Sequence, residues 1–314
     1  MIQTVTGKIE KQSTARALVH EHISCSSNNF IKAFGSKWLD REELAAYATD
    51  VLIAMREQHG LALFGDGTPI DLGRDAKLMR DVSLASGVSI VASSGFYWYP
   101  SYETNCNSSA DLAEWLLMDC EDGMEGTDVK PGLLKCADGL LGMTEAVIKR
   151  HAAVAIAQSK TGLPLYVHCE HVGEQTFEQL ELLTRHGAKA ERIIIGHAAH
   201  RPDADYLARV LDTGCYVTMD QCHCFPDRIE DIAKCLIALC ARGYGDRILL
   251  ANDYCIHSDF AARRYNGLHL EKTRQVEKLG HIFGEVQEAF LAAGGRPQDY
   301  ERMLTANVWD VLDV

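Results

Sequence analysis

Eight short apolar segments recur along the chain, and helical patterns lie between them. This alternation limits the fold more than any other feature, because continuous apolar strands that alternate with helices form a parallel sheet covered on both faces. Eight such units predict a closed (β/α)8, or TIM, barrel of the α/β class. The segments are residues 17–22, 61–67, 88–95, 132–137, 163–169, 192–200, 215–221 and 247–253.

A closed barrel is favoured over an open doubly wound sheet, because no GxGxxG turn follows the first apolar segment. We expect a single domain over residues 1–314, since barrels often reach this length and no low-complexity tract or Pro/Gly-rich linker divides the chain. A short hairpin is expected at Thr6 and Gly7, before the first barrel strand. Two amphipathic helices are expected near the C-terminus, within residues 281–295 and 298–312.

The clearest helical pattern covers residues 143–162. Thr144 suits its N-terminal end, because a hydroxyl can accept a hydrogen bond from a free backbone N–H group, and Gly162 suits its C-terminal end. The spacing of the apolar residues predicts one helical face made of Ile148, Ala152, Ala155 and Ile156.

Charge and composition argue against several classes of partner. The formal net charge of -13 repels phosphate backbones and anionic lipid headgroups, so we expect neither nucleic acid nor a membrane as a partner. The first residues lack the apolar core of a signal peptide, and nowhere do about eighteen apolar residues follow one another. We expect a cytoplasmic protein that binds a small molecule.

The chain contains 11 cysteines, which are scattered through apolar segments. An odd number in such positions is typical of buried thiols rather than of a disulfide framework. Cys222, His223 and Cys224 form a local cluster, but no second cysteine pair at a zinc-finger spacing accompanies them. We therefore interpret most cysteines as packing residues.

Residues that can bind a divalent metal stand at the ends of five apolar segments. In a parallel barrel these ends meet at one mouth, where catalytic groups lie. Two histidines two positions apart in a strand also point to the same side. Each residue alone has a bland explanation, such as a capping histidine or a solvated lysine, but together they predict a metal site. The candidates are His20, His22, Lys135, His168, His197 and Asp253.

Such ligands suit Zn, Mn, Fe, Co or Ni, and residue types alone do not choose among these metals, so zinc is the default expectation. Asp66 and Asp220 end two further segments and are candidates for orienting a ligand imidazole. Other histidines that follow barrel strands are candidates for lining the pocket and not for binding metal. They are His171, His200, His223 and His257.

Lys135 requires chemistry of its own, because a protonated ammonium has no lone pair to donate and is repelled by a metal cation. Reaction of the neutral amine with carbon dioxide gives a carbamate, whose two oxygens can bridge two metals as a carboxylate does. Lys130 is the rival candidate, but it precedes Pro131, before the strand begins.

Several motifs along the chain resemble those of the phosphotriesterase family of the amidohydrolase superfamily. In order, they are "HEH", "LGRDAKLMRDVSLASGVSIVASSGFYWYP", "GMEGTDVKPGLLKCA", "PLYVHCEH", "IIIGHAAH" and "ANDYC". The resemblance runs from about residue 5 to residue 313. It implies a metal-dependent hydrolase with a binuclear centre. A mononuclear deaminase of the same superfamily is less similar, because it requires a glutamate where His171 stands.

The resemblance also assigns the ligands of the two metal ions. It implies that a hydroxide between the ions attacks the substrate and that Asp253 accepts a proton as well as binding metal. Some relatives have a glutamate at the bridging position, where this chain has Lys135 as an N6-carboxylysine. One ion takes His20, His22 and Asp253, the other takes His168 and His197, and carboxylated Lys135 bridges both.

The family includes phosphotriesterases, lactonases and carboxylic esterases, and the loops decide among them. Tyr97 and Tyr99 lie in a stretch similar to the lactonases, although packing within a lid is their alternative role. Gln221 stands where those lactonases have an arginine, which weakens an assignment to acyl lactones. Arg263 and Arg264 are candidates for receiving a carboxylate or phosphate, or they belong to a solvated helix end.

The sequence thus predicts a binuclear metal hydrolase acting on a lactone or carboxylic ester. A phosphotriester hydrolase and an N-acyl amino acid amidohydrolase are the enzymatic alternatives. A ligand-binding barrel that has lost catalysis is the alternative from another class. Relatives of this kind are dimeric, so a homodimer is expected by resemblance, although no heptad or apolar surface stripe indicates one.

Overall fold

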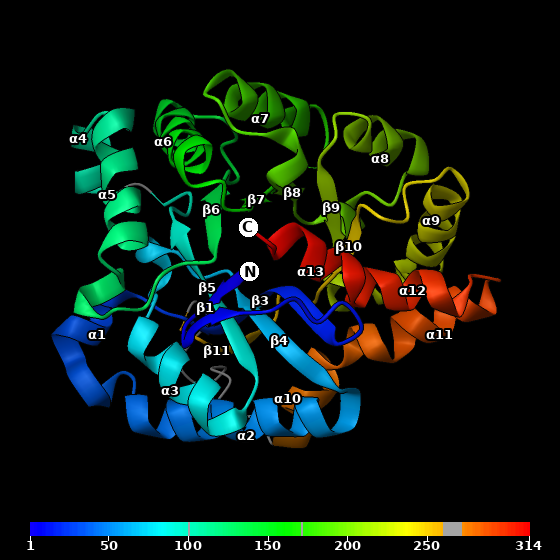
Figure 1. Cartoon of the computed structure of the whole chain (residues 1–314), viewed down its shortest axis with the longest axis horizontal. Coiled ribbons are helices and arrows are strands. Elements are labelled where there is room, and N and C mark those ends of the chain that lie inside the picture. The colour runs from blue at the N-terminus through cyan, green and yellow to red at the C-terminus, as the bar shows by residue number, and fades with distance from the viewer. Residues whose placement is uncertain (100, 171, 260–271) are drawn as a thin grey trace.

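The computed structural model describes residues 1–99, 101–170, 172–259 and 272–314. Its centre is a curled parallel sheet surrounded by helices, as Figure 1 shows from the side on which both termini lie. The sheet has nine strands in the order β10-β9-β8-β7-β6-β5-β4-β3-β11. They are β3 (Arg16–Cys25), β4 (Leu61–Asp66), β5 (Ser89–Gly95), β6 (Leu133–Ala137), β7 (Leu165–His168), β8 (Ile193–Ile195), β9 (Tyr216–Met219), β10 (Ile248–Leu250) and β11 (Cys255–Ser258).

Each of the eight predicted segments overlaps one of the strands β3 to β10, and the predicted hairpin is formed by β1 (Ile2–Thr4) and β2 (Gly7–Ile9). Backbone bonds bring the two edges of the sheet together. The Asp253 amide donates to the His20 carbonyl at 3.0 Å, and the His22 amide donates to the Tyr254 carbonyl at 3.0 Å. The curled parallel sheet and its helices are consistent with the predicted TIM barrel.

Strand β11 was not predicted. It follows β10 after a short break, and it pairs with β3 where β10 pairs with β9. Asp253 lies in the break and has a left-handed backbone conformation, with φ of 51°. The break therefore divides the last position of the sheet into two short strands with Asp253 between them.

The helices follow the strands in sequence and surround the sheet, except that α13 packs against the inner core (Figure 1). They are α1 (Asn28–Phe34), α2 (Arg41–His59), α3 (Ala76–Ser86), α4 (Tyr102–Cys106), α5 (Ser109–Glu121), α6 (Glu145–Thr161), α7 (Glu174–Arg185), α8 (Ala204–Leu211), α9 (Ile229–Ala241), α10 (Lys272–Leu279), α11 (Glu285–Ala292), α12 (Pro297–Leu304) and α13 (Ala306–Leu312). In the part of the chain that the structure describes, every helix is too short or too polar to span a lipid bilayer.

Two details of the helices differ from the sequence predictions. The α6 boundaries agree, since Thr144 caps one end and Gly162 the other, but Ile148 is 38% exposed and Val147 is buried in its place. The helix expected within residues 298–312 is divided at Thr305, whose φ and ψ of -128° and -102° are not helical.

The apolar core has two parts. The larger part lies between the sheet and the surrounding helices. The smaller part lies inside the ring of strands, where Ala17, Val19 and Leu249 meet residues of the two termini. Ile2 and Trp309 complete this inner core, and the Trp309 indole N–H donates to the Ala15 carbonyl at 2.7 Å. The termini thus close one end of the sheet and leave the opposite mouth for the site.

Candidate metal centre

An irregularity in β3 directs two histidines into the interior of the curled sheet. Residues of one strand normally alternate between faces, and the pairing of β3 with β4 shifts register between Leu18 and Glu21. Leu18 accordingly packs in the outer core and Val19 in the inner core. A bulge of this kind re-aims side chains beside active sites. His20 and His22 consequently lie together, with ring centroids 5.2 Å apart.

Each of these imidazoles has a partner at Nδ1. His20 Nδ1 lies 3.0 Å from Asp220 Oδ2, and His22 Nδ1 lies 2.7 Å from Thr68 Oγ1. A partner at one ring nitrogen orients the ring and leaves the other nitrogen for a metal. Burial also lowers the pKa of His20 to about 3. His20 is therefore neutral at pH 7, with a lone pair available at Nε2.

Gly67 provides the space for these rings. A Cβ atom at this position would lie 2.5 Å from His20 Cδ2 and 3.3 Å from His22 Cε1. The contact with His20 is closer than real Cβ contacts, so a larger residue would displace the ring. The requirement for glycine at residue 67 was not recognised in the sequence.

Asp253 brings a carboxylate to the same point. Its Oδ1 lies 3.0 Å from His22 Nε2 and 3.5 Å from His20 Nε2. One ligand atom from each of these three residues falls within 4.8 Å of the other two. Although burial alone favours the protonated acid, the nearby His20 and His22 imidazoles hold the pKa of Asp253 well below its usual range. The three residues fit the ligand set of one divalent cation.

Lys135 reaches the centre from β6. Its Nζ lies 2.6 Å from His20 Nε2 and 4.2 Å from the centroid of the Tyr166 ring, and the residue is 1% exposed. Burial lowers the pKa of Lys135 to about 8, although Asp253 and Asp220 oppose that shift. The neutral amine is thus far more abundant at pH 7 to 8 than for a solvated lysine. Lys130, the rival candidate, lines a separate cavity with Met1 and Gln3, at the closed end.

His168 and His197 form a second pair of ligand candidates. His168 Nδ1 lies 2.8 Å from His197 Nε2, and burial lowers the pKa of His168 to about 4. His197 Nδ1 lies 2.8 Å from Asp220 Oδ1 and 3.9 Å from Asp253 Oδ2. The two facing nitrogens fit a second cation, since two ligands of one metal ion lie about 3 Å apart. The structure thus brings all six predicted ligand candidates together.

The two aspartates expected to orient imidazoles differ in what they do. Asp220 contacts the Nδ1 atoms of both His20 and His197, as expected. The expectation for Asp66 was wrong, because this carboxylate accepts from the backbone amides of Ile23 and Thr68. Thr68, two residues further along, contacts the imidazole instead.

Glu21, the residue between the first two histidines, was not assigned a role from the sequence. It lies fully buried, and burial raises the pKa of its carboxyl well above the usual range. Its Oε1 accepts from the Asn252 backbone at 2.6 Å, and its Oε2 accepts from the Tyr254 backbone at 2.9 Å. Glu21 therefore holds the residues on either side of Asp253.

The aromatic stretch after β5 lies beside the centre. The Tyr97 ring centroid is 5.2 Å from that of His168 and 5.3 Å from that of Tyr99. Tyr99 also lines a cavity of about 470 Å³, in which the described lining residues include two acids, Asp71 and Glu103, and no basic residue. Arg263, Arg264 and His171 lie outside the described residues.

The remaining histidine candidates have partners that the sequence did not indicate. His200 Nε2 lies 2.7 Å from Gln221 Oε1, and His257 Nδ1 lies 2.9 Å from Ser24 Oγ. His223 contacts the rings of Tyr254 and His281. Among the described residues, one group of three histidine, cysteine or acidic side chains has ligand atoms that all lie within 4.8 Å of one another, and it consists of His20, His22 and Asp253.

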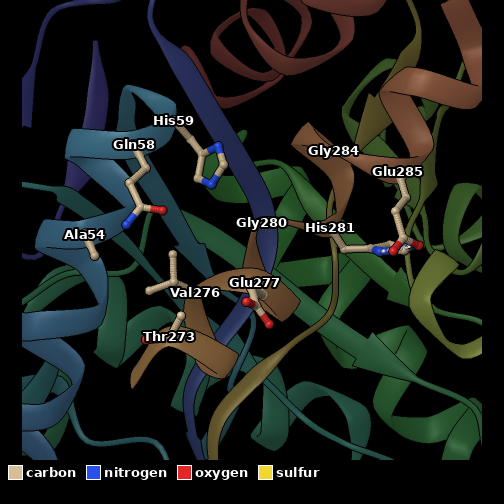
Figure 2. A pocket seen from close by; sticks show the side chains of 10 residues that line it. All are labelled: Ala54, Gln58, His59, Thr273, Val276, Glu277, Gly280, His281, Gly284 and Glu285. Atoms are coloured by element: carbon tan, nitrogen blue, oxygen red, sulfur yellow. Dashed lines mark ion pairs between the residues drawn. The ribbon is translucent and has the colours of Figure 1, made fainter. Parts of the chain in front are cut away.

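A larger cavity of about 520 Å³ lies away from these residues, between α2 and the segment around α10 (Figure 2). His59, Glu277, His281 and Glu285 contribute side chains to it. Figure 2 shows the ion pair of His281 and Glu285, whose Nδ1 and Oε2 atoms lie 3.4 Å apart. Because its lining residues come from α2, α10 and residues 280–285, this cavity belongs to the outer helical layer.

The curled parallel sheet and the histidines, lysine and aspartate at its mouth are typical of metal-dependent hydrolases of the α/β class. The model of the phosphotriesterase family matches residues 1–307. The chain therefore belongs to the phosphotriesterase family, and it is a metal-dependent hydrolase.

Individual relatives support this assignment. The chain is 29% identical over 262 residues to the aryldialkylphosphatase of Saccharolobus solfataricus, covering 82% of each chain. It is 23% identical over 347 residues to the N-acetyltaurine hydrolase of Xenopus tropicalis, covering 98% of this chain and 96% of that protein. The solved structure of the phosphotriesterase from Mycobacterium tuberculosis superposes with a TM-score of 0.88 at 25% identity, covering 99% of this chain and 98% of that one.

Proposed function

We propose that the chain is a binuclear metal hydrolase that acts on a lactone or carboxylic ester. The observation that carries this proposal is the convergence of six metal-binding side chains from five positions of the sheet. The Nδ1 atoms of His20 and His197 are both held by Asp220, so each ring directs Nε2 toward the other candidates. The TIM barrel predicted from the sequence is the architecture in which such a convergence occurs at strand ends.

The residues fit two cations. His20, His22 and Asp253 would hold one, His168 and His197 would hold the other, and Lys135 would bridge them as an N6-carboxylysine. Two zinc ions bound there supply a Lewis acid and lower the pKa of coordinated water toward neutrality. The lowered pKa of Lys135, about 8, supports the carbamate, because only the neutral amine reacts with carbon dioxide.

The chain's own residues supply the remaining chemistry. Asp253 is ionised, and its carboxylate faces the centre, so it is placed to accept the proton of the attacking water. Asp220 fixes two imidazoles and is fully buried, so its carboxylate stays aligned during turnover. Tyr97 borders the site beside His168 and is placed to contact the group that flanks the scissile bond.

The choice of an ester or lactone depends on the surroundings of the centre. The cavity beside Tyr99 offers Asp71 and Glu103 and no described basic residue, which favours an uncharged arm of the substrate over an anionic one. Phosphotriester hydrolysis remains the main alternative, because a carbonyl and a phosphoryl centre under attack both develop negative charge on oxygen. The S. solfataricus relative carries the name of that activity.

An amide substrate is the second alternative, and the N-acetyltaurine hydrolase from X. tropicalis favours it. Its substrate is anionic, so the acidic cavity argues against the same substrate here. A cytoplasmic location, a single domain and a homodimer are further proposals that rest on the sequence alone.

A substrate screen tests the proposed function. Purified protein is reconstituted with zinc and bicarbonate and assayed on lactones, aryl esters, N-acyl amino acids and phosphotriesters. We expect the highest kcat/KM on an uncharged lactone or ester. A higher kcat/KM on an N-acyl amino acid would replace the ester assignment with the amide one. Protein that binds no metal and hydrolyses none of these compounds would favour a binding barrel without catalysis.

A further inference from the structure

We propose that Gln221 is a positioning residue for Asp253 and that His200 holds the Gln221 amide in place. This inference rests on the proposed function, in which Asp253 binds metal and accepts a proton. Gln221 lies just after β9, and β9 is the neighbour of β10, the strand that precedes Asp253. No role for the glutamine follows from the family's ligand set.

The two carboxylate oxygens of Asp253 have different partners. Gln221 Nε2 donates to Asp253 Oδ2 at 2.6 Å. The other oxygen, Oδ1, faces His22 Nε2 at 3.0 Å and His20 Nε2 at 3.5 Å. One oxygen is therefore directed toward the metal candidates while the amide restrains the other.

His200 determines which way the amide points. Its Nε2 lies 2.7 Å from Gln221 Oε1. A carbonyl oxygen only accepts, so His200 donates its Nε2–H, and the NH2 group of Gln221 is left facing Asp253. The His200 ring is itself fixed between two rings, with centroids 5.3 Å from His197 and 4.9 Å from Phe225.

The backbone of Gln221 has an unusual conformation at this position. Gln221 has φ of 55° and ψ of 21°, a left-handed conformation that is costly for a residue other than glycine. His197 and Asp253, in the segments that follow β8 and β10, share this feature with φ of 60° and 51°. The Gln221 amide N–H also donates to the Asn252 carbonyl at 3.1 Å, beside Asp253.

The amide has a chemical consequence for the reaction. A primary amide does not exchange protonation state near neutral pH, so Gln221 restrains Asp253 without accepting its proton. A proton taken up by Asp253 therefore has no route through Gln221 to His200. The pair His200 and Gln221 acts on geometry alone.

The test compares the metal-loaded wild type with Gln221→Leu, which removes both side-chain hydrogen bonds. Loss of such an outer partner typically costs 10–100-fold in metal affinity or activity. We expect kcat to fall at least about tenfold, with KM changed less than about twofold. We also expect the variant to lose zinc at a chelator concentration at least about tenfold lower than the wild type requires. The matched control is Gln287→Leu on α11, where the glutamine also contacts a carboxylate, Glu301, at 3.5 Å; it should behave as the wild type does.

Variants of His200 test the second contact and serve if Gln221→Leu does not fold. His200→Gln keeps an N–H donor for the Gln221 oxygen, and His200→Leu does not. We expect His200→Leu to lower metal retention and kcat, and His200→Gln to retain most of both. His200→Leu should add little to the effect of Gln221→Leu, because His200 acts on Asp253 only through Gln221. Wild-type metal retention and kcat in folded Gln221→Leu, or equal effects of His200→Gln and His200→Leu, would overturn the inference. Wild-type protein without zinc binding or hydrolysis would instead refute the proposed function.

Discussion

One buried carboxylate, Asp220, determines which ring nitrogen carries the proton in two histidines. Its two oxygens contact the Nδ1 atoms of His20 at 3.0 Å and His197 at 2.8 Å, and the Tyr166 hydroxyl donates to it as well. Although burial opposes ionisation, the His197 imidazole lowers the pKa of Asp220 far below its usual range. An ionised Asp220 keeps a proton on each Nδ1, so both Nε2 atoms carry lone pairs.

Lys135 and Asp253 are the residues whose loss should affect the reaction most. We expect Lys135→Met, which cannot form a carbamate, and Asp253→Asn, which cannot accept a proton, each to lower kcat/KM at least about a hundredfold. Steady-state kinetics with zinc and bicarbonate present measure this. The matched control is Lys130→Met at the closed end of the sheet. A hundredfold loss there, or near-full activity in either site variant, would contradict the assigned roles.

At the scale of elements, ion pairs of the buried Arg74 join the loop before α3 to α5 and to the segment between α5 and β6. Arg74 is 7% exposed, and its guanidinium donates to Asp119 Oδ2 at 2.7 Å and to Glu125 Oε1 at 2.8 Å. Glu125 also accepts from the Ala76 backbone amide at the start of α3. Arg74 and Glu125 lie in two of the motifs that carried the family resemblance, and their role in the structure is to fasten loops.

Breaking this network should destabilise the protein. Arg74→Met leaves Asp119 and Glu125 without their cationic partner, and loss of one member of a buried pair typically costs about 3–5 kcal/mol. Arg80→Met is the control, because its partner Asp128 is exposed and a surface pair contributes about 1 kcal/mol or less. Urea unfolding of both variants measures the difference. Equal losses of unfolding free energy would show that burial of Arg74 is unimportant.

Helix α6 carries a histidine that should make stability depend on pH. His151 is fully buried, and burial lowers its pKa to about 4. The folded state therefore binds this proton less readily than the unfolded state, whose histidine titrates near 6.5. The contribution of neutral His151 to the free energy of unfolding is fully present above about pH 6.5. It is lost as the pH falls from 6.5 toward 4.

The variant His151→Leu isolates this contribution. A difference of about two and a half pKa units corresponds to about 3 kcal/mol, so wild type should lose that much more stability than the variant between pH 7 and pH 4. Unfolding free energies of both proteins across this range measure the difference. A difference between the two proteins that does not change with pH would contradict the assignment.

At the scale of the whole molecule, the sheet has a closed end and a reactive end. Ile2 and α13 fill the closed end, and the metal candidates lie where the strands finish. The ligand candidates lie far apart in the chain; His22 and Asp253, for example, are separated by 231 residues. A metal bound at this end therefore links distant strands, and it stabilises the folded state because the unfolded chain does not present the ligands together.

Metal removal should lower the thermal stability of the folded chain. Ligand at about a hundred times its dissociation constant stabilises by about 2.7 kcal/mol, which for a chain of this size corresponds to a few degrees in Tm. Dialysis against a chelator should lower Tm by about that amount and abolish hydrolysis, and zinc with bicarbonate should restore both. An unchanged Tm in protein shown to have lost its zinc would separate the metal from folding stability.

The sequence was sufficient to predict eight of the nine described strands of the parallel sheet and the meeting of six ligand candidates. Those features depend on local periodicity and on which residue types end each strand, and both are visible along the chain. The break at Asp253, the division of the last helix at Thr305 and the exposure of Ile148 were not predicted, because neighbouring elements determine them. Only part of the support around the site was predicted: Asp220 was recognised, whereas Glu21, Gly67 and Thr68 were not.

The sequence by itself determined the class of fold and the chemical identity of the ligands, since alternating apolar segments and the residues that end them are local properties of the chain. The tertiary structure alone decided how those ligands are aimed. The register shift in β3 turns His20 and His22 inward, and Gln221 reaches Asp253 from a neighbouring strand. Contacts between residues so distant in sequence have no local periodicity, so they exist only once the strands have closed around the site.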